Sequence, residues 1–485
     1  CRKPDDEVFV QHFIYTIRSF KDNFIQHVVN FIFLPFEVYV NTGAILRTAW
    51  RIYISKRKLL EWNPFRNHRA GQKSNDHAYR VMWFSPFFSA ALLVYLAIYS
   101  PLTLAKIFPF LVAWSAAPFI AWFISKPVNE KKTEMTREQT IYLRKLARKI
   151  WAFFETYVGR EDNWLPPDNY QEEPVERIAH RTSPTNIGLS MLANLTAYDF
   201  GYITAGEVIE LTSNTINTMY RMEKYRGHLY NWYDTQTLAP LHPRYISTVD
   251  SGNLMGHLIT LKQGLLNIPD EKLIRENIAD GLLDEIRILT DKLKITELKK
   301  FQERLKDNYP EDFDNPEDIK KYIENFDETL TRILVKLDID PGHQADWWIQ
   351  KIFTHIRHIK NDLRSFMPWL YEPVPGKFKD KIPSLPGIPT IKQLCRIEES
   401  LLHRINELYD TDNSDEETEW LSRYRSAIAE AGRKAKAIML TIEQLSARCT
   451  QLINMDYEFL YDKAQHLLTI GYNAEEHRKD NSFYD

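Results

Sequence analysis

The side chains best suited to chemistry gather in two segments, 160–182 and 223–252, in which Trp, Tyr and His alternate with Asp, Asn and Arg. Sugars require this mixture, because their C–H faces stack on aromatic rings while neighbouring hydroxyls bond to carboxylate, amide and guanidinium groups. The aromatic candidates are Trp164, Tyr230, Trp232 and Tyr245. The candidate hydroxyl partners are Asp168, Asn169, Arg181, Asn231, Asp234, Asp250 and Asn253. Both segments therefore predict a carbohydrate-binding site.

Each candidate also has a purely structural interpretation. Trp164 stands before a Leu-Pro-Pro run and could plug the end of a helical bundle. Asp250 and Ser183 could act only as helix caps. The prediction therefore depends on the clustering of aromatic and polar residues in both segments, and not on any one residue.

Four predicted helices position these segments. Their ranges are 139–158, 183–198 with Ser183 as N-cap and Pro184 in the first turn, 204–222, and 253–266. Consecutive helices joined by loops pack antiparallel, so the connections after the first and third helices emerge at the same end of the bundle. Connections between helices usually have about two to eight residues, and two much longer ones at one end indicate a functional surface.

Composition restricts the class of protein. The chain has 485 residues, which is too long for one ordinary domain. Its formal charge of -3 gives no electrostatic reason to expect a nucleic-acid partner. The three cysteines, Cys1, Cys395 and Cys449, form neither a disulfide framework nor a metal-binding pair, so no metal site is predicted. No signal peptide precedes the first helix, and the start at Cys1 suggests a fragment.

Two uncharged apolar runs, 82–100 and 107–125, predict a transmembrane helical hairpin. Each has about 19 residues, or roughly 28 Å of helix, which is close to the thickness of a hydrocarbon core. Basic residues flank the pair on both outer sides, so the positive-inside bias places both ends in the cytoplasm. The alternative is a buried hairpin in the core of a soluble protein.

The earlier apolar stretch 24–40 is interrupted by polar residues and a proline, which is a poor pattern for a membrane span. We expect a helix lying in the membrane interface there, followed by a basic helix over 47–58. A soluble amphipathic helix is the alternative interpretation.

The rest of the chain predicts an all-α protein with a small β-hairpin. Charged helical patterns and a Pro-rich link fill 270–455 and indicate a long helical insertion. Trp347 and Trp348 within it could contact sugar, but core packing is favoured because no polar partners cluster around them. The run 457–473 predicts a hairpin at the mouth of the site, where Tyr461 and Tyr472 could line the groove. The expected divisions are interfacial amphipathic helices with a basic linker (1–80), the transmembrane hairpin (81–126), the first helices of the soluble domain (135–269), the helical insertion (270–455) and the β-hairpin segment (456–485).

Several motifs resemble the cyclic β-1,2-glucan synthases. They are WLPPDNYQ (164–171), HRTSPTNIGL (180–189), YRGHLYNWYDTQTLAPL (225–241) and PRYISTVDSGNLMGHL (243–258). LLEW (59–62) and FLYDKAQHLLTIGYN (459–473) resemble the same family. These motifs are long and are spread along nearly the whole chain, so the resemblance is specific.

This resemblance implies a large bacterial inner-membrane enzyme. In that family a glycosyltransferase extends the glucan from UDP-glucose with a divalent metal, an (α/α)₆ domain cyclises the chain by transglycosylation, and a phosphorylase-like domain trims it. Residues 1 to about 130 would be the membrane end of the glycosyltransferase, and residues from about 135 would begin the (α/α)₆ toroid. The UDP and metal motifs would lie upstream, so no cofactor is expected in this segment.

The family's catalytic glutamates are expected beyond Asp485, so no catalytic residue can be assigned. The resemblance carries over a sugar-binding mouth made of Trp164, Asp168, Arg181, Asn186, His228, Tyr230, Asn231, Trp232, Asp234, Tyr245 and Asp250. The expected partners are a linear β-1,2-glucan chain, the lipid bilayer and the remainder of the synthase.

The resemblance implies β-1,2-glucan synthesis and cyclisation by intramolecular transglycosylation, with the soluble part in the cytoplasm. This chain would supply the membrane anchor and the mouth. The alternatives are a non-catalytic glucan-binding membrane module and a structural anchor for a larger assembly.

Overall fold

The computed structural model describes residues 9–56, 77–126, 135–307, 313–336, 345–379, 381–382, 387–409, 411 and 413–483. The chain forms two compact units, Cys1–Glu134 and Met135–Asp485. It is 72% helical with a few small strand pairs, which confirms the predicted all-α class. The predicted basic linker and the LLEW motif at 59–62 lie outside the described residues.

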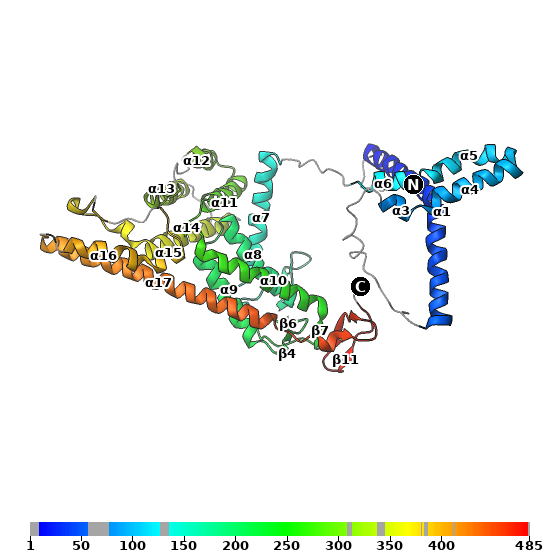
Figure 1. The fold of residues 1–485 in the computed structure, drawn as a ribbon. Helices are drawn as coiled ribbons and strands as arrows, with labels where there is room; N and C mark the ends of the chain where they lie inside the picture. Colours follow the sequence, from blue (N-terminus) through cyan, green and yellow to red (C-terminus); the bar gives the residue numbers. More distant parts are fainter. Residues whose placement is uncertain are drawn as a thin grey trace. The chain divides into compact units, whose positions relative to one another are not determined.

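The first unit contains the predicted hairpin, with different bounds (Figure 1). Its elements are α1 (Phe9–Trp50), the π-helical turn η1 (Arg51–Ser55), α3 (His77–Val81), α4 (Phe84–Tyr99), α5 (Pro101–Ser115) and α6 (Ala117–Ile124). Helix α5 packs against α4 and begins at Pro101, where the missing N–H of proline costs no helical hydrogen bond. The link between the two predicted apolar runs, 101–106, is therefore helical. The second apolar run is broken between α5 and α6, which are bent by 40°.

The expectation of two separate helices over 24–58 is wrong, because α1 runs without a break through 24–40 and on to Trp50. Pro35 lies inside this helix and cannot donate a hydrogen bond to the carbonyl of Phe31. Trp114 of α5 donates its Nε1–H to that carbonyl at 3.0 Å. A contact from a neighbouring helix thus replaces the bond that proline removes, and the helix continues.

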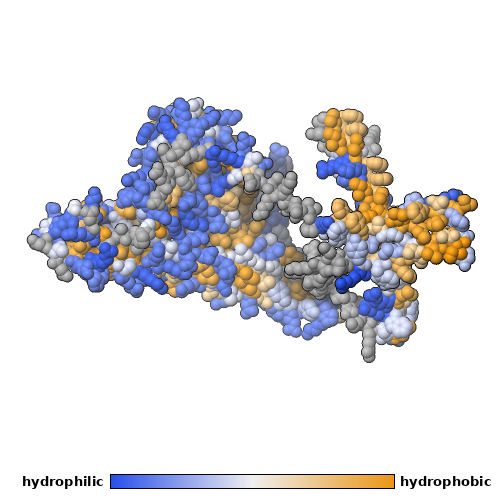
Figure 2. Space-filling view, turned by 45° about the horizontal axis from the view of Figure 1, so that its top comes forward, coloured by the Kyte–Doolittle hydropathy of each residue, from blue (hydrophilic) through white to orange (hydrophobic). Residues whose placement is uncertain are grey.

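Hydrophobic side chains cover much of the surface of the first unit, as the orange surface at the right of Figure 2 shows. By length and composition, His12–Ser55 is the one described helix that could cross a membrane alone, and the bent pair α5 and α6 passes the same test as one span. Helix α4 has 16 residues and is shorter. The stretch expected to lie in the interface is thus part of the longest apolar helix described.

Helices and short strands build the second unit. Its first helices are α7 (Arg137–Tyr157), α8 (Pro184–Phe200), α9 (Ala205–Arg221) and α10 (Thr248–Asn267). They are followed by α11 (Asn277–Leu293), α12 (Thr296–Asp307), α13 (Pro316–Val335), α14 (Asp346–Phe366), α15 (Ile391–Cys395), α16 (Ile397–Tyr409) and α17 (Asp415–Ile453). Ser183 and Thr204 cap α8 and α9, because each hydroxyl accepts a backbone N–H three residues along.

Helix α10 begins earlier than predicted, at Thr248, with Ser247 as its N-cap. The backbone N–H of Asp250 donates to the Ser247 hydroxyl at 3.2 Å. Asp250 therefore lies in the first turn of the helix and is not the cap, which leaves its carboxylate available for contacts with other elements.

The residues predicted as an insertion share one core with the preceding helices. Helix α11 packs on α7 and α8, and the long helix α17 runs beside α9 and α10 (Figure 1). Arg148 of α7 is 1% exposed and bonds to the fully buried Glu285 of α11, which also accepts from His355 of α14. Trp348 is buried against Arg148, which agrees with the favoured core assignment.

The predicted C-terminal hairpin is present as β8 (Tyr461–Asp462) paired with β9 (Leu467–Leu468). Beyond it, β10 (Gly471–Asn473) pairs with β11 (Arg478–Lys479) on one side and β7 (Tyr245–Ser247) on the other. The C-terminal strands are therefore attached to the end of the second long connection.

Candidate functional site

The two long connections meet through a short antiparallel strand pair. Strand β3 (Arg181–Thr182) lies beside β6 (Tyr233–Asp234), with Arg181 opposite Asp234. Two further two-stranded pairs complete these connections, β1 (Tyr170–Gln171) with β2 (Arg177–Ile178) and β4 (Lys224–Tyr225) with β5 (His228–Leu229). The predicted convergence of the two segments is confirmed.

Arg181 joins the first connection to the second. Its Nε and Nη2 donate to Asp168 Oδ2 at 3.2 and 3.0 Å, and its guanidinium carbon lies 4.9 Å from the centre of the Trp232 ring. Asn186 donates to the other oxygen of Asp168 at 3.4 Å, and Asn169 donates to Oδ2 at 3.0 Å. Because Arg181 covers one face of Trp232, a sugar ring could stack only on the other face.

A second polar chain connects Trp232 to helices α8 and α10. With its amide oriented to satisfy both neighbours, Asn231 donates to Asp250 Oδ2 at 2.9 Å and accepts from Trp232 Nε1 at 3.3 Å. Thr185 donates to Asp250 Oδ1 at 2.6 Å, and Asn253 donates to Thr185 Oγ1 at 3.2 Å. These contacts fix the ring of Trp232 from its edge.

Both carboxylates near Trp232 act as hydrogen-bond acceptors within the fold. Each oxygen of Asp168 and each oxygen of Asp250 receives at least one donor. Such carboxylates hold side chains in place and can accept further bonds from hydroxyl groups. Their arrangement suits the binding of a polyhydroxyl ligand better than proton transfer.

Two of the predicted sugar contacts lie beneath the surface. His228 is fully buried, with Nδ1 2.8 Å from Ser251 Oγ and Nε2 2.7 Å from the carbonyl of Asp456. Burial lowers the pKa of His228, which favours the neutral ring. Tyr230 is 4% exposed and donates to Glu223 at 3.4 Å. A sugar cannot reach either ring in this arrangement. Both side chains instead stabilise the second connection through buried contacts.

The remaining predicted residues shape the loops around the site. Trp164 is half-buried with a left-handed backbone, and its carbonyl accepts from Thr215 at 3.0 Å. Tyr245 donates to Asp480 at 3.1 Å and packs on Gly471, where any Cβ would collide with the ring. Asp234 Oδ1 closes a turn by accepting from residues 236 and 237. Burial would raise the pKa of Asp234, but these hydrogen bonds outweigh it and lower the pKa.

The structure adds a pair of residues that the sequence analysis missed, Asp162 and His180. Nδ1 of His180 lies 2.8 Å from Asp162 Oδ1, and the Thr235 hydroxyl donates to the same oxygen. His180 borders a cavity of about 790 Å³. The cavity is lined by Asn169, Gln171, Glu176, Arg177, Ile178, Ala179, His180, Arg181, Asp234 and Leu241.

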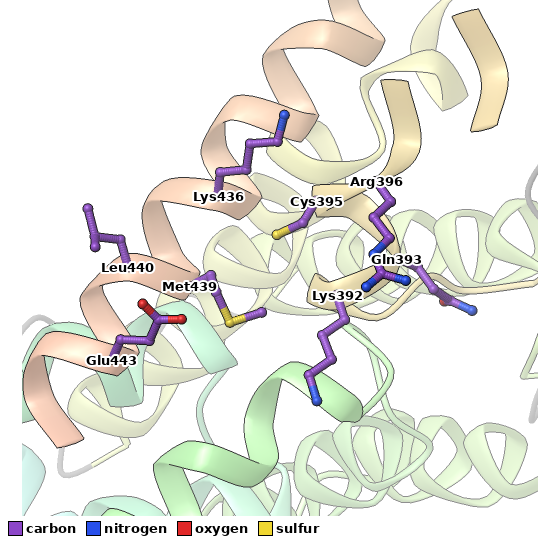
Figure 3. A pocket seen from close by; sticks show the side chains of 8 residues that line it. All are labelled: Lys392, Gln393, Cys395, Arg396, Lys436, Met439, Leu440 and Glu443. Atoms are coloured by element: carbon purple, nitrogen blue, oxygen red, sulfur yellow. The ribbon is translucent and has the colours of Figure 1, made fainter. Parts of the chain in front are cut away.

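Another cavity, of about 580 Å³, lies between α15 and α17 (Figure 3). Lys392 and Lys436 line it, but their ammonium groups point away from one another. Lys392 is held by both oxygens of Asp270 at 2.6 Å. These charges do not converge on a common point, so we place no ligand there.

Within the described ranges, no group of three or more His, Cys, Asp or Glu side chains is arranged to hold a metal ion.

The sequence is 41% identical over 239 residues to the cyclic β-(1,2)-glucan synthase NdvB of Rhizobium meliloti (strain 1021). The match covers 49% of this chain and 8% of that protein, so the chain spans only a small part of its relative. The predicted resemblance to cyclic β-1,2-glucan synthases is confirmed. No family model matches the chain.

A solved structure of a putative glucoamylase from Bacteroides fragilis NCTC 9343 is similar over 39% of each chain. The sequence identity is 17% and the TM-score is 0.22. A likeness at this level does not establish a toroid, and the toroid remains a proposal.

Proposed function

We propose that this chain is the membrane-anchoring and glucan-binding part of a cyclic β-1,2-glucan synthase. The observation that carries the proposal is the contact of Asp168, Arg181 and Trp232, which joins the two long connections into one surface. The 41% identity to a cyclic glucan synthase over half of the chain supports the choice of ligand.

The ligand we propose for this surface is a linear β-1,2-glucan chain. One face of Trp232 offers a platform for a sugar ring, and the exposed edge of Arg181 offers donors for hydroxyl groups. Asn186 and Asn253 add amides at the borders of the same surface. A neutral polyhydroxyl chain uses all of these groups without burying a net charge.

We propose that this chain binds the glucan and that bond cleavage depends on groups elsewhere in the synthase. A retaining glycosidase needs two carboxyl groups about 5 to 5.5 Å apart that flank the scissile bond, one as nucleophile and one as acid. The carboxylates of Asp168 and Asp250 are engaged in hydrogen bonds to protein groups on both oxygens. Helices α7 to α10 would be the first helices of an (α/α)₆ domain completed by the remainder of the synthase.

The first unit would anchor the protein in the bacterial inner membrane, with the second unit on the cytoplasmic side. The apolar exposed surface of α1 and the bent pair α5 and α6 support a membrane partner. The basic residues on both outer flanks of the hairpin support the cytoplasmic orientation.

A second candidate function is a glucan-binding module that has no part in catalysis. This candidate is favoured because protein groups already donate hydrogen bonds to the carboxylates of Asp168 and Asp250. A synthase reconstituted from separate parts distinguishes the two functions. If this chain has a part in catalysis, its removal abolishes cyclisation. If it is only a binding module, its removal lowers the rate of cyclisation without abolishing it.

The direct test is incubation of the purified chain with linear β-1,2-glucan, followed by titration calorimetry and mass spectrometry. We expect saturable binding without the loss of one water that marks a cyclic product. A cyclic product that Asp168→Asn or Asp250→Asn abolishes would place the catalytic centre in this chain and overturn the proposal.

A further inference from the structure

We propose that the cavity bordered by His180 is a second glucan subsite, in which His180 Nε2 accepts a hydrogen bond from a glucosyl hydroxyl. This subsite would extend the surface at Trp232 along the bound chain. The inference rests on the proposed function and adds a place and an orientation for further sugar units.

Two residues of the cavity lining, Arg181 and Leu241, also contact Trp232. Arg181 lines the cavity and also lies against the Trp232 ring. Leu241 lines the cavity and donates its backbone N–H to the carbonyl of Trp232 at 2.9 Å. A volume of about 790 Å³ is within the range of small-molecule sites, so several sugar units could enter.

Asp162 fixes the tautomer of His180. Its Oδ1 lies 2.8 Å from His180 Nδ1, and a carboxylate at that distance requires the proton on Nδ1. Asp162 is itself held by the Thr235 hydroxyl, and the backbone N–H of Thr235 donates to the carbonyl of His180 at 3.1 Å. When Nδ1 carries the only ring proton, Nε2 is an acceptor, and the side chain is 39% exposed at the cavity.

The lining favours a neutral polyhydroxyl ligand. Two carboxylates, Glu176 and Asp234, stand with two guanidinium groups, Arg177 and Arg181, so the formal charges balance. A phosphate would meet the carboxylates and a cation would meet the guanidinium groups, which disfavours both. Within the described residues Arg177 makes no ion pair, which leaves its planar donors for vicinal hydroxyls.

The competing interpretation is that Asp162 and His180 only fasten the first connection to the second. His180→Asn separates the two roles, because the amide of asparagine can replace the Nδ1–H donor to Asp162 but has no atom at the position of Nε2. Arg177→Gln tests a second residue of the cavity lining. Arg425→Gln, on an exposed position of α17, is the matched control.

The experiment is calorimetric titration of the full chain with two linear β-1,2-glucans: the shortest that binds measurably, and one several units longer. In the unaltered protein we expect the longer glucan to bind more tightly. His180→Asn and Arg177→Gln should each weaken the longer glucan by about 3- to 10-fold, the scale of one hydrogen bond, and leave the shorter unchanged. Trp232→Ala should weaken both, and Arg425→Gln neither.

Several results would overturn the subsite. They are equal effects of His180→Asn on both glucans, no effect on either, no gain of affinity with length in the unaltered protein, or binding of inorganic phosphate that Arg177→Gln abolishes. If no glucan binds the unaltered protein, the proposed function itself fails. A length-independent effect with normal binding removes the subsite and leaves the proposed function standing.

Discussion

Replacement of Trp232 by alanine should weaken glucan binding about tenfold. Arg181 covers one face of the Trp232 ring, so a sugar can bury only the other face. A fully buried aromatic side chain removes about 150 to 250 Å² from water, and one face is about a third of that, roughly 60 Å². At about 25 cal/mol per Å² this area is worth about 1.5 kcal/mol, which is about a tenfold change in Kd.

The indirect effect of the same substitution is smaller. Without the ring, Arg181 loses a cation–π contact worth about 0.5 to 1 kcal/mol at a partly exposed site, while its two bonds to Asp168 remain. Trp232→Phe keeps an aromatic face but loses the Nε1–H that donates to Asn231. We therefore expect Trp232→Phe to bind with an affinity between those of the unaltered protein and the alanine variant.

The assay is calorimetric titration with linear β-1,2-glucan, with thermal unfolding of each variant as a check on folding. Tyr142→Ala is the control, because this ring is 64% exposed on α7 and lies in neither connection. Unchanged affinity in a Trp232→Ala variant with an unchanged Tm would show that Trp232 only supports Arg181. The stacking argument would then be refuted.

Three further predictions concern stability and topology. Glu285→Gln should lower the free energy of unfolding of the second unit by about 3 to 5 kcal/mol, because the buried Arg148 loses the charge of its fully buried partner Glu285. Urea unfolding measures this change, and a value below about 1 kcal/mol would contradict the prediction. Burial raises the pKa of Asp362 to about 7, so between about pH 4 and 7 the native state keeps a proton that the unfolded state releases. The free energy of unfolding should therefore fall as pH rises through this window, and Asp362→Asn should remove that part of the fall; parallel pH profiles of the two proteins would refute the assignment. The topology is tested with single cysteines in a protein whose native cysteines are replaced. A cysteine at position 103 should react with an impermeant reagent from the periplasmic side, and one at position 138 should not. Labelling of both positions from one side would exclude the hairpin.

Local signals in the sequence predicted the elements that depend on local physics. Ser183 with Pro184 indicates the start of α8, and the predicted start at 204 agrees with Thr204 as the N-cap of α9. These capping bonds involve only neighbouring residues. The convergence of the two long connections also followed from the antiparallel packing of consecutive helices. The helix starts and the convergence of the connections can therefore be predicted from the sequence without knowledge of the tertiary structure.

Features that depend on contacts between distant residues could not be read in this way. Asp162 and His180 are 18 residues apart, and their pairing depends on the strand pair that brings Thr235 to the same oxygen. The burial of His228 depends on the carbonyl of Asp456, far along the chain. The continuation of α1 through Pro35 depends on a donor from α5. One local signal was available, since Ser247 followed three residues later by an acidic residue is an N-cap pattern.

The most direct test of the central claim is an experimental structure of the chain with linear β-1,2-glucan bound. We expect a glucosyl ring on the face of Trp232 that Arg181 leaves open, with hydroxyl groups bonded to Arg181 and to groups that border it. An empty open face of Trp232 with sugar bound only at other places on the chain, or a glycosidic bond held between the carboxylates of Asp168 and Asp250, would contradict the account.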